Sequence, residues 1–139
     1  MRLLIAGLGQ IGARHAAHAA SMEGIELVGV IDPDQSLAQP GWGQWFPDLE
    51  AVDLAADGLL VATPNPLHPG LAEAAMERGL HVLVEKPLAN TLEECDRIVA
   101  AAERTGKQVL VGHHRRHHAT VAAMKAMLEG GAIGQTVSA

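Results

Sequence analysis

The sequence predicts an α/β fold with a mainly parallel, doubly wound sheet. Short apolar runs of strand length alternate with segments of helical spacing along most of the chain, and this alternation is typical of parallel sheets whose crossover connections are helices. Glycine turns and charged or polar residues follow several of the runs. Because the ligands of such sheets bind beyond the carboxyl ends of the strands, we expect a functional site at that edge.

The first apolar run, 2–6, leads into the glycine turn Gly-Leu-Gly-Gln-Ile-Gly and then into a segment with helical spacing. Gly7 allows the tight turn, Gly9 lets a pyrophosphate approach the backbone, and Gly12 lets the helix pack closely on the strand. The residues of this turn that we expect to bind a dinucleotide are Gly7, Gly9, Gln10, Ile11 and Gly12.

A second apolar run, 26–31, ends in Asp32, twenty positions after Gly12. A Rossmann unit carries, at about this distance, the acid that binds the hydroxyls of the adenosine ribose. The same carboxylate would repel the 2′-phosphate of NADP as a like charge, so we expect NAD, with NADP less favoured. Strand, glycine turn, helix, second strand and acid together predict a Rossmann-type dinucleotide-binding domain, against the alternative of a merely tight turn from strand to helix.

The helix between these two runs carries alanines at i, i+3, i+4 and i+7, namely Ala13, Ala16, Ala17 and Ala20. This spacing predicts a flat, small face toward the sheet.

Composition excludes several classes of protein. The content of 48% apolar and 19% charged residues in a chain of 139 residues indicates one globular domain. No apolar run has membrane-spanning length and no signal-peptide pattern opens the chain, so we expect a cytoplasmic protein without a membrane partner. A net charge of −6 with almost no aromatic residues argues against nucleic-acid binding.

The remaining elements alternate in the same way. We expect strands at 58–62, 80–84 and 108–111, helices at 69–78, 92–106 and 119–129, and an opening strand at 134–139. Thr91 and Glu94 form a capping box, so Glu94 is interpreted as a cap and not as a catalyst. The single cysteine, Cys95, shares a predicted helix face with Ile98 and Val99, and we expect a buried thiol there.

The stretch 33–48 is the least regular part of the chain, since prolines and glycines interrupt any period. We expect a long loop with at most a short strand at 44–46. Trp42, Trp45 and Phe46 supply nearly all the aromatic mass of the chain. We interpret them as packing at the edge of the sheet, with contact to an adenine as the alternative.

Residues with useful chemistry follow the later strands: Thr63, Pro64 and Asn65, then Glu85 and Lys86, and then a run of histidines and arginines over 113–118. Hydride transfer from an alcohol needs a positioned nicotinamide and a group that takes the hydroxyl proton, and a lysine with a lowered pKa can take it or polarise a carbonyl in the reverse direction. Lys86 is the candidate, although a solvated lysine at a strand end, beside Glu85 as a salt-bridge partner, is the alternative.

These motifs resemble the Gfo/Idh/MocA family of NAD(P)-dependent oxidoreductases in their order and spacing over nearly the whole chain. The matching segments are the glycine turn, Thr63-Pro64-Asn65 with His68, Glu85-Lys86-Pro87, and Gly112 followed by Arg115-Arg116. The resemblance implies that Lys86 lies beside the nicotinamide and takes part in substrate binding and proton transfer. It also implies that Glu85 and Asn65 contact the nicotinamide-side ribose and nearby cofactor groups, and we expect Thr63, Pro64 and His68 of the matching segment to bind the cofactor as well.

The run after the last strand is the substrate-side segment of the family, which makes His113, Arg115 and Arg116 candidates there. Arg115 and Arg116 could bind a hydroxyl-rich or carboxylate substrate or pair with surface acids, and both options stay open. The four histidines at 113, 114, 117 and 118 suggest a metal site. We expect no metal, because they precede the predicted helix and lack a nearby acid.

The family carries a second α/β domain that supplies most of the substrate pocket, and this sequence does not contain it. We therefore expect a dinucleotide-binding domain at 1–132, the start of a truncated second domain at 133–139, and a chain that binds cofactor without turnover.

The predicted function is the nucleotide-binding domain of an NAD-dependent dehydrogenase acting on a sugar, cyclitol or related polyol. The alternative is a non-catalytic regulatory or assembly module. We also expect a homo-oligomer, because an unpaired strand edge tends to find a partner, and a cis peptide at Lys86-Pro87.

Overall fold

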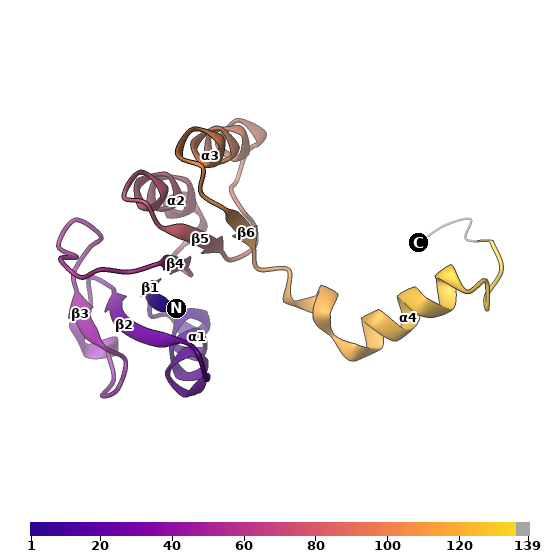
Figure 1. Cartoon of the computed structure of the whole chain (residues 1–139), viewed down its shortest axis with the longest axis horizontal. Coiled ribbons are helices and arrows are strands. Elements are labelled where there is room, and N and C mark those ends of the chain that lie inside the picture. The colour runs from indigo at the N-terminus through magenta and orange to yellow at the C-terminus, as the bar shows by residue number, and fades with distance from the viewer. Residues whose placement is uncertain (136–139) are drawn as a thin grey trace.

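The computed structural model describes residues 1–135, and six parallel strands form its single sheet (Figure 1). The strands are β1 (Arg2–Ala6), β2 (Glu26–Ile31), β3 (Gln44–Phe46), β4 (Gly58–Val61), β5 (His81–Val84) and β6 (Val109–Val111). Their order in the sheet is β3-β2-β1-β4-β5-β6. The chain moves outward from β1 to β3 and then returns to the other side of β1, so the topological switch point lies between β1 and β4. This order confirms the predicted fold class.

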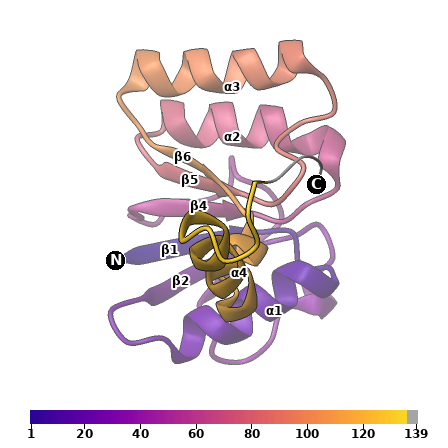
Figure 2. The same cartoon turned by 90° about the vertical axis from the view of Figure 1, so that its right-hand side faces the viewer.

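Helices cover both faces of the sheet. The covering helices are α1 (Gln10–Ser21), α2 (His68–Glu77) and α3 (Leu92–Thr105), and a further helix, α4 (Ala119–Glu129), projects away from the sheet (Figure 1). Figure 2 shows α1 on one side of the sheet and α2 with α3 on the other. Each side has its own apolar core, which explains why all four residues of β4 are buried. A strand that is covered on both faces needs a continuous apolar run, which the sequence has at this position.

The prediction of which residues of α1 face the sheet is partly wrong. Ala16 is buried as expected, but Ala17 and Ala20 are exposed, and Gly12 and Ala19 are buried in their place. The reason is the close approach of α1 to the glycine turn. A Cβ on Gly12 would lie 1.7 Å from the carbonyl oxygen of Gly7, so Gly12 must face the strand, and this contact sets the rotation of the whole helix.

α3 is capped as predicted but buries less than expected. Thr91 and Glu94 form the capping box, and Gly106 ends the helix with a positive φ of 66°. Only a narrow stripe with Ile98 at its centre is fully buried. Val99 is exposed and Cys95 is only half-buried, so the prediction of a buried thiol is wrong. α3 packs on α2 at the outside of the domain, where one narrow face suffices.

The irregular stretch contains the short strand β3 and one 3₁₀ turn, η1 (Gln35–Leu37), that the sequence did not predict. Trp42 and Phe46 are buried in the two cores. The Nε1 of Trp45 donates to the carbonyl oxygen of Asp32 at 2.9 Å. The aromatic residues therefore pack at the sheet edge, as the preferred interpretation has it.

α4 projects away from the sheet and has no buried residue (Figure 1). Its main neighbour is the short 3₁₀ helix η3 (His114–His117). Several of its apolar side chains are exposed, as is Ile133, and the expected self-association stays a prediction. Of the expected strand at 134–139, residues 136–139 lie outside the described part, and Gly134 and Gln135 are not in a strand. No described helix is long and apolar enough to cross a membrane.

The contact between Gly12 and Gly7 makes a prediction about stability. Gly12→Ala should lower the free energy of unfolding by about 1–3 kcal/mol or more, because the new methyl group meets backbone atoms that cannot move independently. Gly70→Ala on α2 is the matched control, since a Cβ there has no neighbour within 4 Å and helices favour alanine. Urea titration of both variants checks this, and equal stability of the two would contradict it.

Candidate functional site

The register of the sheet brings the carboxyl ends of its strands into one row. Ala6 pairs with Ile31 and with Val61, and the row continues through Val84 and Val111. The sheet hydrogen bonds extend one residue further, at 2.8 to 2.9 Å, for four of the residues that follow. The residues in this next row are Gly7, Asp32, Ala62, Glu85 and Gly112. The predicted convergence of the functional clusters on one edge is therefore confirmed.

The glycine turn is shaped by two close approaches and one open position. Gly7 has a φ of 87°, and a Cβ there would lie 2.7 Å from the backbone of Ala62. Gly12 is pressed against the Gly7 carbonyl, as described above. Gly9, in contrast, has no atom within 4 Å of the place of a Cβ. Its backbone therefore faces open space at the N-terminus of α1, where N–H groups and the helix dipole favour an anion.

Asp32 fixes the end of β2 to the glycine turn. Its Oδ2 accepts from the backbone N–H of Leu8 at 2.7 Å, and its Oδ1 accepts from the N–H of Asp34 at 2.9 Å. An ionised carboxylate offers about four acceptor positions, so two further hydroxyl donors can still be accepted. The carboxylate is only partly buried and borders a cavity.

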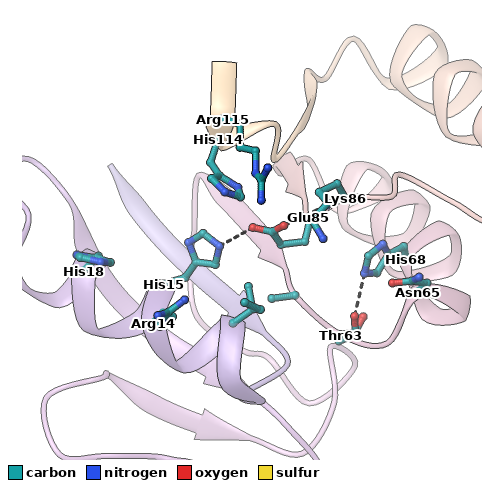
Figure 3. A pocket seen from close by; sticks show the side chains of 12 residues that line it. Arg14, His15, His18, Thr63, Asn65, His68, Glu85, Lys86, His114 and Arg115 are labelled. Carbon is teal, nitrogen blue, oxygen red and sulfur yellow. Dashed lines mark hydrogen bonds and ion pairs between the residues drawn. The ribbon is translucent and has the colours of Figure 1, made fainter. Parts of the chain in front are cut away.

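Two cavities flank the switch point. The apolar cavity, of about 650 Å³, lies on the β2 side and contains Asp32 among side chains such as Leu37, Leu67 and Leu71. The polar cavity, of about 710 Å³, lies on the β5 and β6 side (Figure 3). The two cavities share three lining residues, Ile11, Ala62 and Thr63. They are therefore two halves of one continuous surface along the strand ends.

Five segments of the chain contribute side chains to the polar cavity (Figure 3). They contribute Arg14, His15 and His18 from α1, Thr63 and Asn65 after β4, His68 from α2, Glu85 and Lys86 after β5, and His114 and Arg115 from η3.

Glu85 is the one carboxylate of the polar cavity. The Nε2 of His15 lies 2.8 Å from its Oε1, and the backbone N–H of Lys86 donates to its Oε2 at 3.2 Å. Burial by itself raises the pKa of Glu85. The hydrogen bonds from His15 and Lys86, together with the nearby charges of His15 and His114, lower it by more than burial raises it, so the pKa lies below its ordinary value. The absence of a side chain at Gly112 leaves space for the Glu85 carboxylate, since a Cβ there would lie only 3.2 Å from it.

His68 connects the turn after β4 with the turn after β5. Its side chain is buried, its Nε2 lies 2.9 Å from the carbonyl oxygen of Thr63, and its Nδ1 lies 2.9 Å from that of Pro87. The peptide bond between Lys86 and Pro87 is cis, which confirms that prediction. His68 thus holds the turn after β4 against the turn after β5. Its expected contact with a cofactor stays a prediction.

The residues present fit a bound dinucleotide. Gly9 leaves the glycine turn open, and Asp32 has acceptor capacity to spare. The buried Oγ1 of Thr63, at the junction of the two cavities, has no hydrogen-bond partner among the described residues. A buried hydroxyl without a partner is costly, and a polar group of a ligand lying across the junction would satisfy it.

Most predicted site residues come together here. Those that line the two cavities are Gly7, Gly9, Gln10, Ile11, Asp32, Thr63, Pro64, Asn65, His68, Glu85, Lys86 and Arg115. Gly12 lies buried beneath the turn. His113 and Arg116 line a smaller, adjoining cavity of about 140 Å³, which shares Lys86, His114 and Arg115 with the polar cavity. Within residues 1–135, no cluster of three or more His, Cys, Asp or Glu side chains is arranged to hold a metal ion.

Sequence reasoning missed four side chains of the polar cavity: Arg14, His15, His18 and His114. Three of them lie in the second and third turns of α1, where the pattern of basic residues at i, i+1 and i+4 was a usable signal. Their direction depends on the rotation of α1, which the contact of Gly12 sets.

A parallel sheet in this strand order, with a glycine turn and an acid at the ends of its first two strands, defines a dinucleotide-binding domain. Residues 1–113 match the Gfo/Idh/MocA family, described as an oxidoreductase family with an NAD-binding Rossmann fold. The chain belongs to this family, as the resemblance of its motifs indicates.

Relatives and solved structures agree with this assignment. The chain is 33% identical to glucose-6-phosphate 3-dehydrogenase of Bacillus subtilis, with 96% of this chain and 39% of that protein aligned. It is 34% identical to inositol 2-dehydrogenase 1 of Saccharopolyspora erythraea, over 99% of this chain and 44% of that one. The chain spans about 40% of the length of the curated relatives it matches.

Two solved structures are similar over nearly the whole chain. The myo-inositol 2-dehydrogenase from Lactobacillus plantarum has a TM-score of 0.91 and 26% identity, covering 97% of this chain and 42% of that one. The WlbA dehydrogenase from Bordetella pertussis, in complex with NADH and UDP-GlcNAcA, has a TM-score of 0.87 and 30% identity, covering 94% and 40%.

The pairing of His15 with Glu85 makes a prediction about ionisation. In the His15→Ala variant the pKa of Glu85 should rise, because burial still disfavours the carboxylate and the imidazole no longer donates to it. In the unchanged protein, Glu85 contributes stability that is present above its unfolded pKa and is lost as the pH falls through its lower folded pKa. Carboxyl ¹³C NMR titration measures the pKa directly. His18→Ala is the control, and an equal pKa in all three proteins would contradict the account.

Proposed function

We propose that this chain is the NAD-binding part of an oxidoreductase that transfers hydride between NAD and a sugar, cyclitol or related polyol. One observation carries the proposal: two cavities of similar size meet at Ile11, Ala62 and Thr63, over the switch point of the sheet. A dinucleotide has two halves joined by a pyrophosphate. The apolar cavity with Asp32 suits the adenosine half, and the polar cavity with Lys86 suits the nicotinamide half.

The residues around the junction would hold the cofactor. The open backbone of Gly9 and the N-terminus of α1 would bind the pyrophosphate, and Gln10 and Ile11 would border it. Asp32 would accept the adenosine ribose hydroxyls, while Thr63, Pro64 and Asn65 would lie along the path to the nicotinamide half. When bound, NAD supplies the hydride acceptor of the reaction.

Lys86 would move the proton of the reaction. Its side chain lines the polar cavity, and no described carboxylate makes an ion pair with its ammonium group. A lysine beside a reacting hydroxyl can take the hydroxyl proton in its neutral form, and in the reverse direction the ammonium form can polarise the carbonyl and return the proton. Glu85, bonded to His15 and to the Lys86 backbone, would keep this turn in place.

The names of the relatives support a polyol or sugar substrate. The curated relatives above are named as dehydrogenases of a sugar phosphate and of inositol, and the solved WlbA dehydrogenase is described with a bound sugar nucleotide.

The alternative, a non-catalytic dinucleotide-binding module, would not need an unpaired lysine at the nicotinamide half. Substrate orientation can supply about 7–11 kcal/mol of a barrier, and the described residues line an open polar cavity from the sheet edge, α1, the turn before α2 with His68, and η3. We therefore propose that this chain alone does not turn over polyols.

Cofactor preference tests the role of Asp32. The unchanged chain should bind NADH more tightly than NADPH, and Asp32→Asn should narrow the difference by removing the charge that repels a 2′-phosphate while keeping an acceptor for Leu8. Asp34→Asn is the matched control, because its carboxylate is engaged with Ser36 and lies outside the cavity. Titration calorimetry measures the affinities of all three proteins for both cofactors, and equal binding of NADH and NADPH by the unchanged chain would remove the assignment.

Comparison of NADH with ADP-ribose tests the place of Lys86. ADP-ribose lacks the nicotinamide, so Lys86→Met should weaken the binding of NADH severalfold and leave that of ADP-ribose nearly unchanged. Lys107→Met, at the amino end of β6, is the control and should change neither. An equal loss for both ligands would place Lys86 away from the nicotinamide. No binding of either ligand by the unchanged chain would refute the proposed function.

A further inference from the structure

The polar cavity has a charge opposite to that of the whole chain. The chain has a net charge of −6. Three cationic side chains, Arg14, Lys86 and Arg115, nevertheless line this one cavity with the single carboxylate of Glu85. That carboxylate is already hydrogen-bonded to His15. Within residues 1–135, none of the three cations has a carboxylate within ion-pair distance.

The pyrophosphate of a dinucleotide does not account for all of these cations. It would lie at the glycine turn after β1, whereas Arg115 follows β6, the third strand along from β1 in the sheet. Neighbouring strands lie about 4.8 Å apart, so Arg115 belongs to a part of the edge about 14 Å from the glycine turn. Lys86 follows β5, which also lies beyond the switch point.

The nicotinamide does not account for them either. Its ring is positively charged when oxidised, so unpaired cations around it are unfavourable unless an anion also enters the cavity. A concave site lined by one sign of charge concentrates ligands of the opposite sign. Arginine is suited to carboxylate and phosphate groups because its guanidinium donates two parallel hydrogen bonds to them.

We infer that the polar cavity selects an anionic co-substrate, a sugar or polyol that carries a carboxylate or a phosphate, and that Arg115 and Arg14 bind this group from η3 and from α1. In Figure 3 Arg115 reaches the cavity from η3, above Glu85, whereas Arg14 lies on α1 and Lys86 lies to the right of both arginines. The inference rests on the proposed function, because it takes the cavity to be the nicotinamide half of the site. The reacting hydroxyl would lie at Lys86 and the anionic group at the arginines.

The test uses the full 139-residue chain saturated with NADH, which prevents turnover of an alcohol probe. Calorimetric titrations with D-glucuronate, D-glucose 6-phosphate and D-glucose compare a carboxylate, a phosphate and a neutral sugar of the same ring. We expect at least one anionic probe to bind about tenfold or more tightly than D-glucose, as a charge-assisted hydrogen bond implies. The preference should weaken as salt is raised.

Arg115→Gln and Arg14→Gln should each reduce the preference for the anionic probe several-fold. Arg97→Gln, which removes the same charge from the outside of α3, should leave it unchanged. Equal binding of neutral and anionic probes, no binding of any probe, or an equal effect of all three substitutions would overturn the inference. Fluorescence of bound NADH is read in every sample, so a loss of cofactor binding, which refutes the proposed function itself, is distinguished from a loss of anion selectivity.

Discussion

The packing of Gly12 against the carbonyl oxygen of Gly7 is the constraint on which the rest of the site depends. It brings α1 so close to β1 that no side chain fits between them. It thereby sets the rotation of α1, so that Ala16 and Ala19 face the sheet and His15 can reach Glu85 two strands away. The N-terminus of the same helix stays open at Gly9. One backbone contact thus positions the anion site and a wall of the polar cavity.

The second organising feature is the parallel register, which aligns the strand ends and leaves their following residues in one row. Tertiary contacts then fix the turns: Asp32 holds Leu8, His68 bridges the carbonyls of Thr63 and Pro87, and His15 holds Glu85. These polar contacts keep the loops in place without filling the cavities. A rigid edge with open space above it is what a preorganised cofactor site requires.

Local patterns predicted the fold and most of the site, because they act within one strand, turn or helix. The apolar runs, the capping box of Thr91 and the glycine turn are of this kind. The errors arose where an outcome depends on packing. The exposure of Ala17 follows from the rotation of α1, and the partial exposure of Cys95 from the outer position of α3. The contact of His68 with Pro87 spans nineteen residues of sequence, and no local pattern reveals it.

The central claim is that one dinucleotide lies across the carboxyl edge of the sheet and occupies both cavities. Amide NMR spectra recorded during a titration with NADH test it most directly. The account predicts large shift changes at Gly9, Asp32, Thr63 and Lys86 together, saturating at one affinity, with little change at the amino ends of the strands. Changes confined to the residues of only one cavity, or centred on the amino ends, would contradict it.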